Sequence, residues 1–187
     1  MVFFNAVVGA KRLELLRQVV PRAKVIGMLV NPGSTMTEAD RTDVQAAAQA
    51  VGQQLITLDV SSENDIEKAV ANLVRHGAGA LLVGTGPLLT SVAERLVALS
   101  ARYGLPTSYN AREPVLAGGL LSYGASMTDA YRQAGIYAGR IVNGEKPGDL
   151  PVVQSNKLEF VINLKTAQTL GLEVPAIVLA RADEVIE

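Results

Sequence analysis

The sequence predicts an α/β fold built on a doubly wound, parallel sheet of about five strands. Short apolar runs alternate along the chain with segments whose apolar residues have helical spacing, and glycines follow several of those segments. In addition, 49% of the 187 residues are hydrophobic and 19% are charged, which is typical of globular proteins with strands buried on both faces. Right-handed crossovers would then place helices on both faces, with a ligand crevice at the carboxyl ends of the strands.

The first part of the chain holds the regular alternation of strands and helices. Strands are expected at residues 25–30, 54–60, 80–84, 107–109 and 120–123. Helices are expected at residues 10–20, 64–76 and 89–103. One more helix, with Thr37 or Asp40 as its N-cap, is expected to end at Gly52.

The last part of the chain is less regular. Residues 129–142 have apolar side chains at helical spacing, and Asn143 and Gly144 would end that helix. A long extended passage follows, with strand character at residues 151–153 and 159–162. We therefore expect one isolated helix followed by weaker strands.

Composition argues against several classes of function. Seventeen basic and eighteen acidic residues leave a net charge of -1, without the basic stripe that nucleic-acid binding needs. The absence of cysteine excludes disulfides, a thiolate zinc site and a cysteine nucleophile. His76 is the single histidine, and no HExxH, GxSxG or paired-carboxylate motif is present. We expect no catalytic residue, no metal ligand and no cofactor.

The loop after the first expected strand carries the first candidate ligand contacts. Asn31 is followed by Pro32 and Gly33, and Ser34 and Thr35 bring hydroxyl groups beside free backbone N–H groups. This loop lies where doubly wound proteins contact their ligands. Because GxxxxGK[ST] is absent and Asn-Pro-Gly is also an ordinary turn, ligand contact and a plain turn both remain open.

The segment after the third expected strand opens a helix and carries further hydroxyl groups. Thr85, Thr90 and Ser91 are predicted to hold a carboxylate or another small anion near the positive end of that helix. Simple helix capping is the alternative. Dinucleotide binding is not expected, because the third glycine of GxGxxG and the acidic residue on the next strand are absent.

The loop after the fourth expected strand gathers polar side chains of several kinds. Asn110 is predicted to orient a ligand, and Arg112 to pair with a ligand carboxylate. An exposed ion pair between Arg112 and Glu113 is the alternative. Tyr123, at the end of the fifth expected strand, completes the predicted rim.

Several blocks of sequence resemble one family of transport proteins. Residues 11–16 read KRLELL, residues 30–32 read VNP, and residues 112–114 (REP) are followed by AGGLLSYG at residues 117–124. Further blocks follow in order from Tyr131 to Glu184. Together they are similar to the ABC-transporter substrate-binding proteins of the tryptophan-binding, TrpX-like type.

The resemblance implies a type 1 periplasmic binding fold, in which a hinge motion closes a ligand between two lobes. On that template, residues 1–22 form a helix before the lobe crossover, and residues 23–127 form the C-terminal ligand-binding lobe. Residues 128–150 hold a helix of the N-terminal lobe, which is largely missing, and residues 151–187 return to the C-terminal lobe. Members of the family are typically longer and begin with an export signal, which this chain does not show.

The resemblance also implies a function. The chain is expected to be the solute-binding component of an ABC importer, binding a small polar molecule such as an amino acid without catalysis. The NP, REP and SYG blocks carry the family positions, at Asn31, Arg112 and Tyr123. An ABC permease is the expected partner, and the location is periplasmic or lipid-anchored outside the cytoplasmic membrane. Because the helices at residues 10–20 and 129–142 would expose apolar stripes, we also expect a homodimer through them.

Two other functions remain open. A ligand-sensing regulatory domain of the LacI type has the same fold, but it would need a DNA-binding domain, and no helix-turn-helix or basic segment is evident. A small α/β enzyme is disfavoured because no catalytic group of residues is visible.

Overall fold

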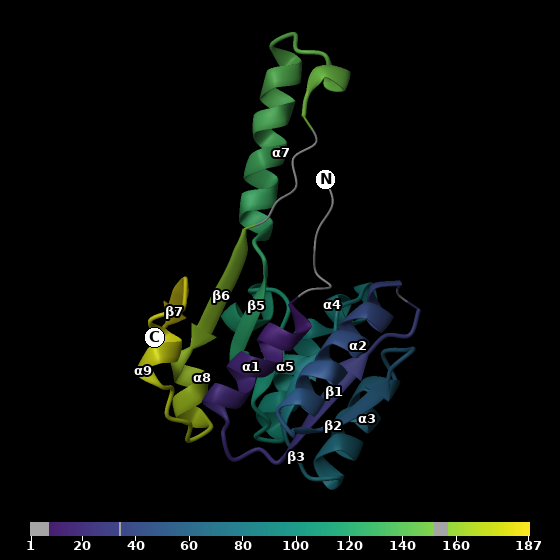
Figure 1. The fold of residues 1–187 in the computed structure, drawn as a ribbon, viewed down its shortest axis with the longest axis vertical. Coiled ribbons are helices and arrows are strands. Elements are labelled where there is room, and N and C mark those ends of the chain that lie inside the picture. Colours follow the sequence, from purple (N-terminus) through teal and green to yellow (C-terminus); the bar gives the residue numbers. More distant parts are fainter. Residues whose placement is uncertain (1–7, 34, 152–156) are drawn as a thin grey trace.

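The computed structural model describes residues 8–33, 35–151 and 157–187, and these form a seven-stranded sheet with helices around it (Figure 1). The strand order is β2-β1-β3-β4-β5-β6-β7. The strands are β1 (Val25–Val30), β2 (Gln54–Asp59), β3 (Ala78–Val83), β4 (Thr107–Tyr109), β5 (Leu121–Ala125), β6 (Leu158–Asn163) and β7 (Glu184–Ile186). Neighbouring strands are parallel except for β5 and β6. The predicted α/β class is confirmed.

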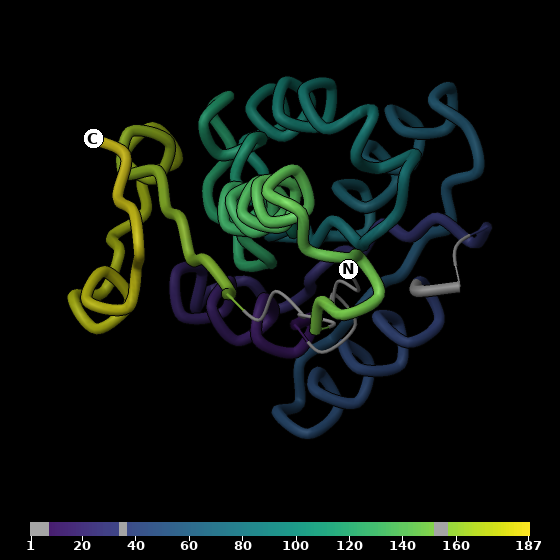
Figure 2. The backbone as a smooth tube through the Cα atoms, turned by 90° about the horizontal axis from the view of Figure 1, so that it is seen from above, coloured from purple at the N-terminus to yellow at the C-terminus, as the bar shows by residue number. Residues whose placement is uncertain are grey.

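Helices cover both faces of this sheet, as the view from above shows (Figure 2). Side chains of α1 and α2 belong to one hydrophobic cluster, and those of α3 and α5 belong to the cluster on the other face. The helices are α1 (Gly9–Val19), α2 (Thr35–Ala50), α3 (Asp65–Arg75), α4 (Pro87–Ser91), α5 (Ala93–Arg102), α6 (Glu113–Leu116), α7 (Met127–Val142), α8 (Leu164–Thr169) and α9 (Ala176–Leu179), with a 3-10 turn at Pro147–Asp149.

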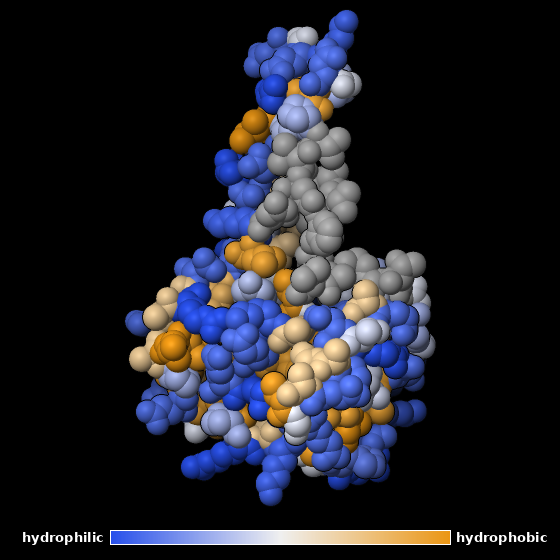
Figure 3. Space-filling view, viewed as in Figure 1, coloured by the Kyte–Doolittle hydropathy of each residue, from blue (hydrophilic) through white to orange (hydrophobic). Residues whose placement is uncertain are grey.

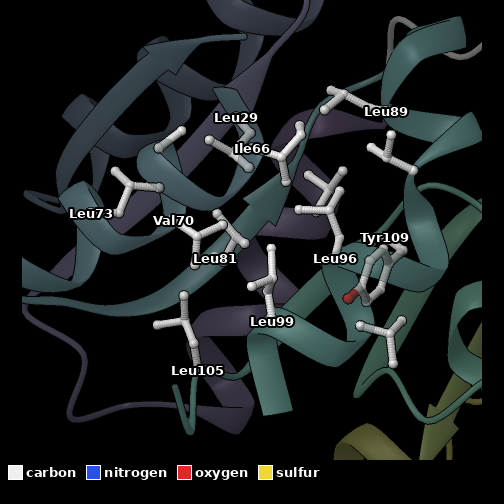
Figure 4. Packing of buried hydrophobic residues seen from close by; sticks show 14 of the residues in the cluster. Leu29, Ile66, Val70, Leu73, Leu81, Leu89, Leu96, Leu99, Leu105 and Tyr109 are labelled. Carbon is white, nitrogen blue, oxygen red and sulfur yellow. The ribbon is translucent and has the colours of Figure 1, made fainter. Parts of the chain in front are cut away.

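The strand β1 lies at the centre of the core. All six of its residues are buried, and successive side chains point to opposite faces of the sheet. Ile26 and Met28 pack in the cluster under α1 and α2, whereas Leu29 packs with Leu73 of α3 (Figure 4). This explains why its sequence is a continuous apolar run instead of an alternating pattern.

The end of the chain extends the sheet beyond the five predicted strands. The strand β6 pairs antiparallel with β5, and β7 then pairs parallel with β6. The strand predicted at residues 151–153 falls mainly in a segment outside the described residues. Antiparallel pairing here reflects the route of the chain, which leaves the sheet after β5, passes through α7 and comes back in the opposite direction.

Two predicted helix boundaries are wrong. The helix expected at residues 89–103 is divided into α4 and α5, and the hydroxyl groups of Thr90 and Ser91 donate to the backbone carbonyls three or four residues earlier in the chain. Such bonds bend or interrupt helices. The helix α2 begins at Thr35, so neither Thr37 nor Asp40 is its N-cap.

The helices α1 and α7 differ in where their apolar side chains lie. In α1, Leu13, Leu16 and Val19 are buried against the sheet, so the expectation that residues 10–20 expose an apolar stripe is wrong, and the homodimer stays a prediction. The helix α7 projects away from the sheet, and Ala130 is its single buried residue (Figure 1). Among the described residues, no helix combines the length and apolar character needed to cross a bilayer.

Candidate functional site

The candidate site lies at the carboxyl ends of the neighbouring strands β1, β3, β4 and β5. The connection after β1 leads to α2 on one face of the sheet, whereas the connection after β3 leads to α4 and α5 on the other face. The strand order therefore reverses direction between β1 and β3. Ligands of open α/β sheets bind in the crevice at this kind of switch point. The loops predicted from the sequence converge there.

The loop after β1 is held by polar contacts of its own backbone and side chains. The amide nitrogen Nδ2 of Asn31 donates to the carbonyl of Val60 over 3.0 Å, which joins the ends of β1 and β2. The hydroxyl of Thr37 donates to the carbonyl of Asn31. Ser34 and the side chain of Thr35, both predicted as ligand contacts, lie outside the described part of the chain.

The loop after β3 packs directly against the loop after β1. The amide of Gly84 donates to the carbonyl of Leu29 over 2.8 Å, and a Cβ atom at Gly84 would lie 2.6 Å from that oxygen. Gly86 has a φ of +146°, and a Cβ there would lie 3.4 Å from the Cβ of Asn31. Gly84 therefore allows an approach that a larger residue would prevent, whereas Gly86 is favoured by its positive φ.

The predicted hydroxyl groups of this second loop have different surroundings. Thr85 is buried, and its hydroxyl has no hydrogen-bond partner among the described residues. Thr90 and Ser91 are exposed, and their hydroxyls donate to the carbonyls of Gly86 and Leu88, at the start of the five-residue helix α4. Thr85 therefore lies in the loop at the switch point, whereas Thr90 and Ser91 lie further along, on α4.

The ends of β4 and β5 are brought together by a glycine. A Cβ atom at Gly124 would lie 1.9 Å from the carbonyl oxygen of Asn110, so no other residue fits there without moving the backbone. Asn110 is half-buried, and its side-chain amide makes no hydrogen bond within the described residues. Tyr123 is also half-buried and packs against the core face that α1 covers. Asn110, like Thr85, is thus a predicted rim residue whose polar side-chain group makes no hydrogen bond within the described residues.

Arg112 is already paired with carboxylates. It donates to Glu159 over 3.1 Å and to Glu184 over 2.5 Å, so the expected alternative, an ion pair with Glu113, is not the one observed. Glu159 also accepts from the hydroxyl of Ser126, the N-cap of α7. These two bonds use one N–H of Nη1 and one N–H of Nη2, so three of the five N–H groups of the guanidinium lie outside these ion pairs. It lines a small polar recess beside Asn110.

Two charged residues beneath the crevice were missed from the sequence. Arg12 and Asp40 form an ion pair with side-chain exposures of 0% and 1%. The helical spacing of these two residues relative to apolar residues could have indicated their burial. Arg12 shares the face of Leu16 and Val19 at i, i+4 and i+7, and Asp40 stands at i–4 from the buried Val44. A charged residue on an apolar stripe indicates a buried partner.

Amide and hydroxyl groups predominate among the candidate side chains of this site. No group of three or more His, Cys, Asp or Glu side chains in the described ranges is placed to hold a metal ion. Below Asn110, burial raises the pKa of Tyr109 far above its usual value, so this phenol stays neutral. The loops at this edge of the sheet carry the amides of Asn31 and Asn110, the hydroxyl of Thr85 and the paired guanidinium of Arg112.

Comparison with known proteins decides the family. The sequence profile described as "ABC transporter substrate binding protein" matches residues 5–186. The chain belongs to this family. The match confirms the resemblance predicted from the sequence blocks. The substrate-binding proteins of ABC transporters bind solutes and are not catalysts.

Two solved structures share the fold over 95% of this chain. One is the ABC domain from Streptococcus pneumonia in complex with L-Trp, with 28% identity and a TM-score of 0.80. The other is a conserved domain protein from Vibrio cholerae, with 24% identity and a TM-score of 0.79. The chain covers 62% and 60% of those two proteins. It thus spans less than two thirds of either structure.

A curated relative is similar over most of this chain. The tyrosine-binding protein of Clostridioides difficile is 23% identical over 163 residues, which cover 87% of this chain and 47% of that protein. The chain therefore spans about half the length of this relative.

Proposed function

We propose that this chain is the C-terminal lobe of the solute-binding component of an ABC importer, and that its ligand is an amino acid. The observation that carries the proposal is the family match over residues 5–186, combined with the 28% identity to a protein solved with L-Trp. The name of the tyrosine-binding relative supports the same class of ligand. The protein would work outside the cytoplasmic membrane and present its ligand to an ABC permease.

The ligand contacts proposed on this lobe are the predicted rim residues. Asn31 and Thr85 flank the switch point, and Asn110 offers a half-buried amide without an internal partner. Amide and hydroxyl groups can accept from an amino group and donate to a carboxylate, so neutral side chains can hold a zwitterion. The remaining proposed contacts are Ser34, Thr35, Thr90, Ser91, Arg112 and Tyr123.

We propose that a second lobe supplies the other wall of the crevice. The helix α7 projects on the side where β5 ends, and apolar patches interrupt the polar surface of this projection (Figure 3). Tyr131 is 73% exposed and Val142 is 86% exposed. Residues 128–150 would pack in that lobe, while residues 1–22, 23–127 and 151–187 would stay with the sheet. A homodimer through α7 would cover the same side chains.

Isothermal titration calorimetry tests the ligand class. L-Trp and L-Tyr are titrated into this chain and into a version extended upstream, with D-glucose as a control solute. We expect tight binding of an amino acid by the extended version and weaker binding by this chain, because one wall contributes only part of the contacts. The variant Asn110→Ala should weaken binding, whereas Asn64→Ala, at the exposed start of α3, should not. Binding of neither amino acid by either version would overturn the proposed ligand class.

A further inference from the structure

Buried side chains of α1 and α2 form hydrogen bonds to the backbone at both ends of the turn that follows β3. Arg12 of α1 donates through Nη1 to the carbonyl of Val83 over 2.5 Å, and Asp40 of α2 accepts from the amide of Thr85 over 3.2 Å. Between them, Nη2 of Arg12 lies 3.0 Å from both carboxylate oxygens of Asp40. The four groups form a continuous bridge from the last residue of β3 to the residue that lies two positions later.

The close packing of α1 against α2 brings the charges of Arg12 and Asp40 together. A Cβ atom at Gly9 would lie 2.5 Å from Oδ1 of Asp40, so the start of α1 approaches α2 closely because residue 9 is glycine. The amide of Ala10 donates to Oδ2 of Asp43 over 2.8 Å, which fixes α1 to α2 at the same level. The bridge is therefore held by two packed helices and not by mobile surface side chains.

Joining two helices by a buried ion pair has a large cost in desolvation free energy. Removing two charges from water costs free energy that their attraction often fails to recover, and apolar replacements of similar volume are often as stable. Here, moreover, Nε of Arg12 is buried and has no hydrogen-bond partner in the part of the chain that the structure describes. Stability alone therefore does not account for a pair placed beneath the switch point. What the pair does supply is a fixed position for the backbone of residues 83–85.

We propose that Arg12 and Asp40 are positioning residues for ligand binding. They do not touch the ligand. They fix the turn between β3 and α4, and with it Thr85 and Gly86, which packs against Asn31. Ligand affinity would then depend on the pair more strongly than folding does. This inference rests on the function proposed above.

The test uses the protein extended upstream and two measurements. In the double variant Arg12→Met/Asp40→Leu both charges disappear together, so no unpaired charge is buried. We expect a thermal midpoint close to that of the parent protein, but an increase of about ten-fold in Kd for L-Trp or L-Tyr, because the turn loses two hydrogen bonds. Hydrogen exchange of the Thr85 amide, followed by NMR without ligand, should accelerate by about ten-fold as its acceptor is lost.

The matched control is Lys11→Met. It removes a charge from α1, the helix that carries Arg12, but Lys11 pairs with Glu14 on the exposed side of that helix and not with the turn after β3. Its Kd and the exchange of Thr85 should stay at the parent values. The variant Arg12→Lys keeps the charge but loses the forked geometry, and it should weaken binding in a protein that still folds.

The outcomes separate this inference from the proposed function. A folded double variant with the parent Kd and a protected Thr85 amide would overturn the positioning role. If neither the double variant nor Arg12→Lys folds, the pair serves the fold and the inference is also overturned. If the parent protein binds neither amino acid, the proposed ligand class fails, and the exchange of Thr85 still shows whether the pair holds the turn.

Discussion

The helices α1 and α7 have similar sequence patterns and opposite environments. Both carry apolar residues at helical spacing, but Leu16 of α1 is fully buried, whereas Val142 of α7 is 86% exposed. Residues of α1 pack in the cluster on one face of the sheet, and a single residue of α7 is buried. The difference shows that periodicity identifies a face that will be buried but not the surface that buries it.

The two helices also handle charge differently. Arg12 of α1 is buried and reaches the turn after β3. Arg140 of α7 pairs with Glu145 in the following turn, and both are exposed to solvent. The first ion pair joins separate parts of the fold, whereas the second joins neighbours in sequence. Changes in α1 should therefore alter the stability of this chain, and equivalent changes in α7 should not.

The largest effect is expected from Arg12→Met. This change leaves Asp40 buried without its partner and should lower the free energy of unfolding by about 3–5 kcal/mol. Lys11→Met, at the adjacent exposed pair with Glu14, should cost less than about 1 kcal/mol. Chemical denaturation followed by circular dichroism measures both. Equal losses would contradict the different environments of the two basic residues.

A core deletion should have the next largest effect. Leu16→Ala in α1 should cost about 2–5 kcal/mol, because a fully buried side chain is replaced by a cavity. Val142→Ala in α7 should change stability by no more than about 0.5 kcal/mol in this chain. The same denaturation experiment applies. A large loss at Val142 would mean that α7 is already covered, for example by a second copy of the chain.

The helix α7 should become sensitive once its partner lobe is present. Ile136 is 45% exposed, and Ile136→Ser should cost about 0.5 kcal/mol or less in this chain. In the version extended upstream, we expect a loss of about 1–3 kcal/mol as the side chain becomes buried. Thermal unfolding of both versions measures the contrast. An equally small effect in the two would argue against packing of α7 in a second lobe.

The smallest effect concerns a carboxylate on the exposed side of α1. A hydrogen bond from Lys11, helped by Arg181 and opposed by burial, lowers the pKa of Glu14 below its ordinary value of 4.5. Its stabilisation is therefore present above pH 4.5 and is lost as the pH falls through the lowered pKa. Glu14→Gln should cost less than about 1 kcal/mol at pH 7. The difference from the parent protein should vanish in acid, and denaturation across pH checks this.

A matched variant lies at the far end of α7. A hydrogen bond from Arg140 lowers the pKa of Glu145 in the same way, but this pair connects α7 only to its own following turn. Glu145→Gln should therefore leave the unfolding of the sheet unchanged at every pH. A pH-dependent loss there would show that α7 unfolds together with the sheet.

Local patterns were sufficient to predict much of the sheet and the positions of its loops. Apolar runs identified β1 and β3, and the α/β alternation placed Asn31, Thr85 and Asn110 at one edge. The extension by β6 and β7 could not be predicted in the same way, because their pairing depends on where the chain returns after α7. The strand character expected at residues 159–162 is confirmed by β6, but the expected sheet of about five strands was too small.

The chemistry of the site was harder to predict than its place. The sequence could not show that Arg112 would meet Glu159 and Glu184, since these carboxylates are distant in the chain and reach it through β6 and β7. Asp40 was interpreted as a helix cap because acidic residues are common there. Its burial becomes visible only when α1 is docked beside α2.

The close approach of Gly124 to Asn110 limits where the direction of the chain can change. Because only glycine fits beside that carbonyl, the end of β5 lies directly against the end of β4. The amide of Ser126, one residue beyond the strand, donates to the carbonyl of Lys157 on the returning segment. We therefore expect a rotation of α7 relative to the sheet to begin at Ser126. The sheet would then stay rigid while α7 rotates about a hinge at its first residues.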